Sequence, residues 1–129
     1  MPPIDELTRI EPVLLARLDR MGIFTTGLLL EVSETPTRRQ TLADQLATDI
    51  LEVLDWRDEA LMLNLASFGP AEHQLLNQAG VDGLRDILAL SLDDLRARVR
   101  RAASELEMEP PSDLTIESWW DQARTLGDE

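Results

Sequence analysis

The chain has 129 residues, no cysteine and a formal net charge of −13, because 25 acidic residues outnumber 12 basic ones. Without cysteine, disulfides, thiol catalysis and thiolate metal sites are excluded. A field of this sign repels nucleic acid backbones and anionic membrane surfaces, so both partners are disfavoured. No apolar run reaches the roughly 18 residues that a membrane-spanning helix needs, and residues 1–6 lack the basic and apolar regions of a signal peptide. We expect a cytoplasmic protein with no membrane contact.

Apolar residues recur three and four positions apart along the whole chain, which predicts an all-α fold without strands. Helices are expected near 4–9, 12–21, 25–33, 36–46, 48–55, 57–67, 70–79, 83–89, 91–107 and 113–126. Gly22 and Gly80 stand where a left-handed residue closes a helix, and Thr35 and Ser91 suit the position before a helix begins. Consecutive prolines at 110 and 111 separate the last helix from the one before it.

The sequence repeats itself at an offset of 58 residues. The matched residues are those that shape helices: an opening proline, a closing glycine and inward leucines. Identical pairs are Leu7 with Leu65, Pro12 with Pro70, Leu18 with Leu76, Gly22 with Gly80, Leu30 with Leu88 and Ser33 with Ser91. We predict a single domain, 1–129, with repeat one at 4–33, bridging helices at 34–57, repeat two at 58–91 and a C-terminal extension at 91–129. Because one copy cannot cover its own apolar stripe, the two copies are expected to pack about a pseudo-two-fold axis.

In the second repeat, Phe68-Gly69-Pro70 leads through a helix that ends in leucines to Ala79-Gly80-Val81. This pattern resembles the helix-hairpin-helix superfamily. From Leu7 to Leu126 the chain is also similar to a family of bacterial proteins that carry two such units and are classed as a domain of unknown function. The stretches that support this second resemblance are 21–26, 39–43, 53–56 and 119–123. The resemblance implies a fold, and that family lends no activity.

The resemblance also implies a site at each hairpin, because helix-hairpin-helix proteins generally bind DNA phosphates through bare backbone N–H groups and a helix N-terminus. The hairpin residues are Ile10, Glu11 and Pro12 in the first copy, and Phe68, Gly69 and Pro70 in the second. Glu11 replaces a family glycine, and we expect its carboxylate to satisfy the N–H donors at the start of the next helix. The second hairpin keeps one glycine but contains no cation. The fold is therefore expected to persist without its usual ligand.

The remaining ionisable residues form no recognisable catalytic constellation. His73 is the only histidine, so a multi-histidine metal site is excluded, and we interpret His73 as a packing residue. The acidic run at Asp55, Asp58 and Glu59 lacks the alternating ligands and glycine of a calcium loop. We interpret Asp58 and Glu59 as residues that favour the start of a helix. We predict that the protein is not an enzyme and has no catalytic residue, no metal site and no cofactor.

A basic helix and a tryptophan pair are the candidate contacts with a partner. These residues are Arg96, Arg98, Arg100, Arg101, Trp119 and Trp120. Arginine forks match carboxylate and phosphate oxygens, although acidic neighbours on the same helix explain much of the patch as ordinary ion pairs. The adjacent tryptophans point about 100° apart on a helix, so one is expected in the core and the other at the surface. We predict a non-enzymatic interaction, scaffold or adaptor module whose partner is another protein. The alternative is weak nucleic acid binding, without sequence preference, through the second hairpin and the arginine helix.

Overall fold

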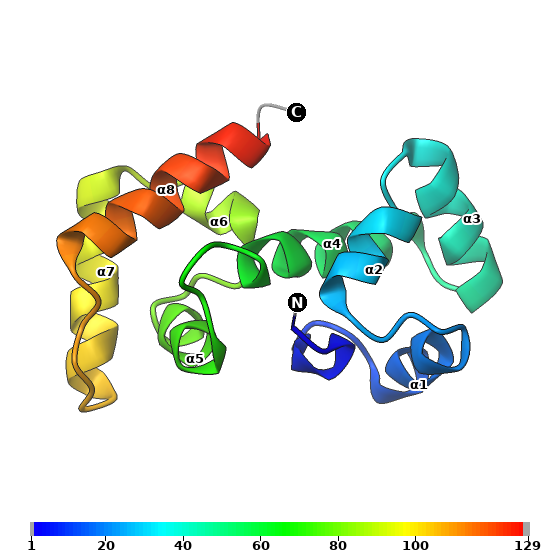
Figure 1. The fold of residues 1–129 in the computed structure, drawn as a ribbon, viewed down its shortest axis with the longest axis horizontal. Helices are drawn as coiled ribbons and strands as arrows, with labels where there is room; N and C mark the ends of the chain where they lie inside the picture. The colour runs from blue at the N-terminus through cyan, green and yellow to red at the C-terminus, as the bar shows by residue number, and fades with distance from the viewer. Residues whose placement is uncertain (1, 128–129) are drawn as a thin grey trace. The chain divides into compact units, whose positions relative to one another are not determined.

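The computed structural model describes residues 2–127 and is all-helical over that range (Figure 1). The elements in chain order are a short 3-10 helix, η1 (Ile4–Glu6), followed by α1 (Pro12–Arg20), α2 (Thr26–Val32), α3 (Pro36–Leu46), α4 (Ile50–Leu63), α5 (Pro70–Gln78), α6 (Leu84–Leu88), α7 (Leu92–Glu105) and α8 (Asp113–Gly127). Within the described residues, β pairing is limited to one isolated bridge between Pro3 and Thr25. The predicted all-α fold is confirmed.

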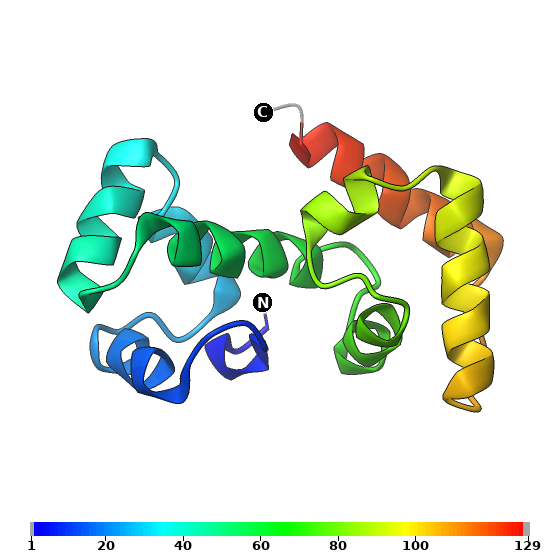
Figure 2. The same ribbon diagram turned by 180° about the vertical axis from the view of Figure 1, so that it is seen from behind.

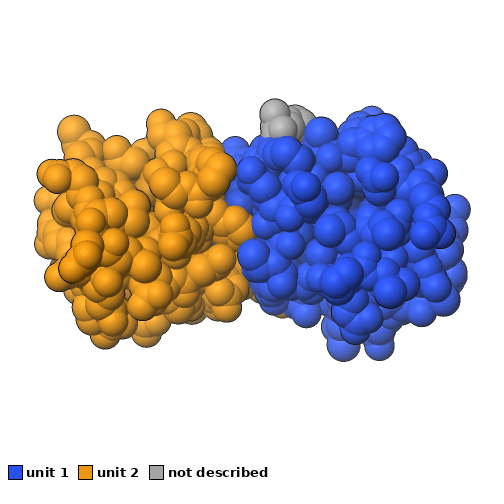
Figure 3. All heavy atoms as spheres, turned by 90° about the horizontal axis from the view of Figure 1, so that it is seen from below, with its two compact units in different colours: residues 1–64 blue, residues 65–129 orange. Residues whose placement is uncertain are grey.

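The chain divides into two compact units, residues 1–64 and residues 65–129, coloured separately in Figure 3. In unit 1, α2 and α3 both pack against α4, and η1 packs against α1 (Figure 1). In unit 2, α6 and α7 both pack against α8, and α5 packs against α7 (Figure 2). The segment expected to bridge two repeats belongs by its contacts to unit 1, and the expected C-terminal extension belongs to unit 2. The single domain and the pseudo-two-fold axis stay predictions.

Helix α4 is one continuous helix of 14 residues, where the sequence analysis expected two. That prediction is wrong because nothing between Asp55 and Arg57 interrupts a helix, and because the side chain between them, Trp56, is buried in the core at 1% exposure. Val53 and Ala60 lie on the same buried side at spacings of three and four. A stripe of that spacing stabilises one long helix against α2 and α3.

The helix ends follow the predicted capping residues. Thr35 accepts a hydrogen bond from the backbone N–H of Arg38, and Ser91 accepts one from Asp94, so both residues precede a helix as predicted. Gly22 and Gly80 both have φ of +81°, a left-handed value that glycine adopts without strain.

The same hydrogen bond follows each closing glycine. Ile23 donates to the carbonyl of Leu18 at 3.0 Å, and Val81 donates to Leu76 at 2.8 Å, 58 residues further on. Because these two hydrogen bonds join corresponding residues, the sequence repeat is also a repeat of local backbone structure at this turn.

The fourth helix of each unit carries a second correspondence, which the sequence analysis missed. At an offset of 63 residues, α4 and α8 match at three fully or almost fully buried pairs. These are Val53 with Ile116, Trp56 with Trp119 and Ala60 with Ala123. Both tryptophans lie at the centre of their unit, at 1% and 0% exposure. The offset grows from 58 to 63 because α7 is longer than α3 and the connection from α7 to α8 is longer than that from α3 to α4, which together outweigh the shorter α6.

Candidate functional site

The first hairpin is held by a buried carboxylate from α4. Glu59 is fully buried, and its Oε1 accepts hydrogen bonds from the backbone N–H groups of Thr8 at 2.8 Å and Arg9 at 3.1 Å. Its Oε2 accepts from the hydroxyl of Thr8 at 2.6 Å. Arg9 in turn reaches α4, where its guanidinium lies 2.9 Å from Asp58 and 3.0 Å from Asp55. Consecutive N–H groups form a site for an anion, and here the anion is a carboxylate of the chain itself.

Two predictions about this region are wrong. The exposed Glu11 precedes α1 but its side chain makes no capping hydrogen bond, so it does not satisfy the helix donors. Asp58 and Glu59 do not start a helix, because α4 already begins at Ile50 and both carboxylates are buried. Their partners at residues 8 and 9 lie about 50 residues away in sequence, a pairing that local patterns do not reveal.

The second hairpin is also satisfied internally. The backbone N–H of Gly69 donates to Oε1 of Glu72 at 2.8 Å, and Pro70 opens α5 immediately afterwards. The backbone N–H of Ala66 donates to Oε1 of Gln122 on α8 at 3.0 Å. Ala66 corresponds to Thr8 at the offset of 58, and Gln122 corresponds to Glu59 at the offset of 63. The hydrogen bond from the backbone before the hairpin to the fourth helix, which we call the hairpin tie, is therefore accepted by a neutral amide in unit 2. At both hairpins, side chains of the chain itself occupy donors that a phosphate would use.

The predicted arginine helix, α7, is paired with α8 within unit 2. Arg96 lies 3.5 Å from Glu117, 3.8 Å from Asp93 and 3.9 Å from Asp113. Arg100 also forms an ion pair with Asp113. Residues 96 and 100 therefore lie on one face of α7, because both contact the carboxylate of Asp113. The carboxylates of α8 could not be expected as partners from the sequence of α7 alone.

The other two arginines of α7 are more open. Arg101 is 68% exposed, and its one ion pair among residues 2–127 is with Glu105, one turn further along the helix, at 3.8 Å. Arg98 is exposed and has no ion pair or hydrogen bond within residues 2–127. Exposed pairs of this kind contribute little to stability, so neither arginine is required by the fold.

The tryptophan pair divides as predicted, with one side chain in the core and one nearer the surface. Trp119 is fully buried, packs edge-on against Phe68 with ring centroids 5.5 Å apart, and donates its indole N–H to the carbonyl of Ala66 at 3.0 Å. Trp120 is half-buried, donates to the carbonyl of Leu90 at 3.1 Å and has the guanidinium of Arg124 4.6 Å from its ring centroid. Because each indole N–H already donates to a backbone carbonyl, the structure gives neither tryptophan an unsatisfied hydrogen-bond donor for a partner. The single histidine, His73, is buried on α5, as its interpretation as a packing residue requires.

A surface that sequence reasoning missed lies along α1. Two adjoining grooves of about 440 and 480 Å³ run beside this helix and share the exposed residues Pro12 and Ala16. Val13 is 61% exposed at one groove and Phe24 is 56% exposed at the other. We call the α1 face the set Pro12, Val13, Ala16, Arg17, Arg20 and Phe24. Large apolar side chains at this exposure contribute little to the core, and where several of them adjoin a groove they can mark an interaction surface.

The repeat provides the signal that identifies the α1 face. At the 58-residue offset, several buried apolar positions match, such as Leu18 with Leu76, although Leu14 aligns with Glu72 and Leu75 with Arg17. The exposed Val13 aligns with Ala71, and Phe24 with Asp82. Arg20 likewise aligns with the neutral residue Gln78. These differences, together with the exposure of Val13 and Phe24, are the signal that marks this surface.

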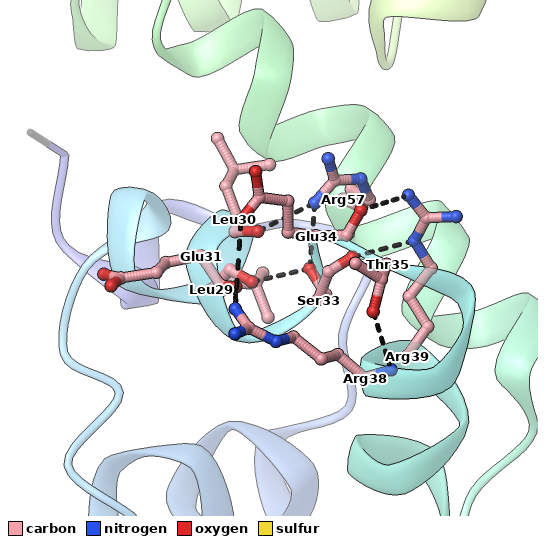
Figure 4. Close-up of polar contacts among 9 residues, drawn as sticks. All are labelled: Leu29, Leu30, Glu31, Ser33, Glu34, Thr35, Arg38, Arg39 and Arg57. Atoms are coloured by element: carbon pink, nitrogen blue, oxygen red, sulfur yellow. Dashed lines mark hydrogen bonds and ion pairs between the residues drawn. The ribbon is translucent and has the colours of Figure 1, made fainter. Parts of the chain in front are cut away.

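Three arginines bind the C-terminal end of α2, where it meets α3 (Figure 4). The guanidinium of Arg57 donates to the carbonyl of Leu30 at 2.9 Å and to the hydroxyl of Ser33 at 3.1 Å. Arg39 donates to the carbonyls of Ser33 at 2.8 Å and Glu34 at 3.0 Å. Burial lowers the pKa of Arg57, the charge of Arg39 lowers that pKa further, and Glu34 opposes the shift. The third arginine, at position 38, donates to the carbonyl of residue 31 at 3.2 Å. The hydrogen bonds of the three arginines satisfy carbonyl groups at and just after the C-terminal end of α2, which have no partner within the helix.

Among the described residues, no group of three or more acidic or histidine side chains is arranged to hold a metal ion. None of the helices in that same range is long and apolar enough to cross a membrane.

The arrangement defines an all-helical protein in which side chains of the chain itself accept hydrogen bonds from backbone N–H groups at or just before each hairpin. A family model described as "Domain of unknown function (DUF4332)" matches residues 8–126, and the chain belongs to this family. The match spans both units, from the first hairpin to the end of α8. Neither the curated proteins nor the solved structures contain a match to the chain.

Proposed function

We propose that this protein is a non-enzymatic binding module that engages another protein through the α1 face. The observation that carries the proposal is the exposure of Val13 and Phe24 beside two grooves in unit 1, at positions where unit 2 has alanine and aspartate. Because unit 2 has a small or charged residue at these two positions, the backbone turn that the units share does not require an apolar side chain there. An exposed apolar side chain present in only one of them is typical of a contact surface.

The partner that fits the α1 face is an amphipathic helix with acidic residues along one edge. The centre of the face is apolar, at Pro12, Val13 and Ala16, and can accept side chains of a helix at spacings of three and four. One edge is basic: Arg20 is exposed and has no partner within the described residues, and Arg17 is exposed beside it. Acidic residues on the partner complement this edge and favour one orientation of the bound helix.

The proposal includes a helix-hairpin-helix origin for both units. It is supported by the two prolines that open α1 and α5, by the left-handed glycines that follow these helices, and by the matching ties at Glu59 and Gln122. In this view the ancestral phosphate site has been replaced by internal partners, and the protein acts as an adaptor. The absence of cysteine from the sequence favours a reducing compartment, and we propose the cytoplasm.

The test is affinity capture from the native host, followed by titration calorimetry with the captured protein. Phe24→Asp and Val13→Ala place on the α1 face the residues that unit 2 has at the same positions, so both variants should fold. If Phe24 is a central contact, Phe24→Asp should weaken binding by about 30-fold or more, the loss typical of a buried aromatic anchor. Leu114→Ala is the matched control, because Leu114 is 78% exposed and lies on α8. Equal affinity of the wild type and Phe24→Asp would refute the proposal.

Nucleic acid binding is the alternative, and a titration with short duplex DNA distinguishes it. True phosphate contacts give an affinity that falls steeply as salt rises. Since Glu59 and Glu72 already occupy hairpin donors, we expect no saturable binding at ordinary ionic strength. Saturable, salt-sensitive binding that is lost when Arg98 and Arg101 become glutamine would favour the alternative over the protein partner.

A further inference from the structure

Arg39 and Arg57 are held side by side by uncharged oxygens alone. Their hydrogen-bond acceptors are three backbone carbonyls and one serine hydroxyl at the junction of α2 and α3 (Figure 4). Neither guanidinium forms an ion pair with any carboxylate of residues 2–127. In a chain with 25 acidic residues and 12 arginines, two adjacent cations without a carboxylate partner call for an explanation.

The fold itself needs a hydrogen-bond donor at position 57, and does not need a charge. At the 63-residue offset, Arg57 aligns with Trp120. Trp120 donates its indole N–H at 3.1 Å to the carbonyl of Leu90, which lies just after the end of α6. The carbonyl of Leu30, which Arg57 contacts, likewise lies near the end of α2. A neutral indole therefore holds the corresponding helix junction in unit 2. The charge on Arg57 is an addition in unit 1.

That additional charge is unfavourable to folding. The pKa of Arg57 is lowered by burial and by the neighbouring charge of Arg39, so its environment disfavours the charged form. Glu34 compensates only in part, since its carboxylate is 67% exposed and lies 3.8 Å from a different arginine, Arg38. An unfavourable arrangement of charge that a neutral residue can replace is characteristic of a functional site.

We propose that Arg39 and Arg57 together bind a small oxyanion, through a carboxylate or phosphate group that bridges the two guanidiniums. Backbone carbonyls fix both side chains in place, which lowers the conformational entropy that binding must remove. Nη1 of Arg39 and Nη2 of Arg57 make no hydrogen bond within residues 2–127 and can donate to such a group. Guanidinium forks match the oxygens of carboxylates and phosphates. The net charge of −13 disfavours polyanions, so the ligand is a small molecule with one or two such groups.

The test is an NMR titration of the full chain at pH 7, observing the side-chain N–H resonances of arginine. Sodium phosphate and sodium acetate serve as separate probes for the two oxyanions, and sodium chloride is the reference at matched ionic strength. We expect saturable shifts confined to Arg39 and Arg57 with at least one oxyanion. Whichever probe binds more tightly identifies the chemical group of the natural ligand.

Two variants make the result specific. Arg57→Trp introduces the residue found at the corresponding position in unit 2, and should retain the fold while weakening oxyanion binding about tenfold, the effect of losing one charge-assisted contact. Arg57→Lys tests the fork, because it retains the charge without the planar donors. Arg101→Gln in unit 2 is the control and should bind like the wild type. Equal shifts with chloride, or undiminished binding by a folded Arg57→Trp protein, would overturn the proposal.

Discussion

The buried carboxylate of Glu59 accepts hydrogen bonds from both the backbone N–H and the hydroxyl of Thr8, at 2.8 and 2.6 Å, across 51 residues of sequence. With the N–H of Arg9, three donors converge on one side chain. Leucine at position 59 would leave these donors without acceptors, and we expect Glu59→Leu to lower the free energy of unfolding by about 3 kcal/mol. Urea denaturation followed by circular dichroism measures this loss.

The corresponding hydrogen bond in unit 2 allows the contribution of the Glu59 carboxylate to be compared with that of a neutral amide. Its equivalent residue, Gln122, accepts one hydrogen bond, from Ala66 at 3.0 Å. We therefore expect Glu59→Gln, which retains an acceptor oxygen, to cost only about 1 kcal/mol, and Gln122→Leu to cost a similar amount. Amide hydrogen exchange at residues 8 and 9 should accelerate in Glu59→Leu. If both substitutions at Glu59 are neutral, the carboxylate does not hold the hairpin.

The three tryptophans should differ in their accessibility to a quencher. Trp56 and Trp119 are at most 1% exposed, whereas Trp120 is half-buried. The acrylamide quenching curve of the wild type should therefore contain an accessible and an inaccessible component of the fluorescence. The accessible component should disappear in Trp120→Phe. Trp119→Ala removes a central core side chain and its bond to Ala66, and should cost about 4 kcal/mol. A Trp120→Phe protein that retains the accessible component would contradict this assignment.

Residues that act within a few positions of each other were predictable from the sequence. Helix ends at Gly22, Thr35 and Ser91 depend on local backbone geometry and capping, and each agrees with the structure. The division between Trp119 and Trp120 follows from the angle between adjacent helix positions and is likewise confirmed. The predicted break within α4 is absent, because acidic residues such as Asp58 and Glu59, which suit the start of a helix, lie here in the middle of one.

Contacts between distant segments were beyond sequence reasoning. The ties of Glu59 to Thr8 and of Arg96 to Glu117 join residues on different elements, so no periodicity within one helix reveals them. The α1 face was missed for a different reason: single apolar residues are common on surfaces, and a sequence does not show which of them are exposed. The exposure of Val13 and Phe24, at positions where unit 2 has a small or charged residue, is visible only in the structure.

Arg57→Trp should raise stability at low salt. The lowered pKa of Arg57 means that the folded state disfavours its charged form relative to the unfolded state, so at pH 7 the charge opposes folding. The penalty would lessen only as pH rises through the lowered pKa of the folded state. Repulsion from Arg39 is screened by salt, so the difference in Tm between variant and wild type should shrink as sodium chloride increases. A difference that grows with salt would contradict this account, and thermal unfolding at three salt concentrations measures it.

Asp113 should couple Arg96 and Arg100 across the contact between α7 and α8. Both arginines contact its carboxylate, and they lie one turn apart on α7, so without it two like charges face each other. Arg96 is 23% exposed, whereas Arg100 is 55% exposed and surrounded by more water. We expect Asp113→Asn to cost about 1 kcal/mol and Arg100→Gln less than that, because exposed ion pairs are weak. In the double variant the two losses should not add, since removing Arg100 also removes the repulsion that Asp113→Asn uncovers. Urea denaturation of the two single variants and the double variant measures this coupling, and strictly additive losses would show that the three side chains act independently.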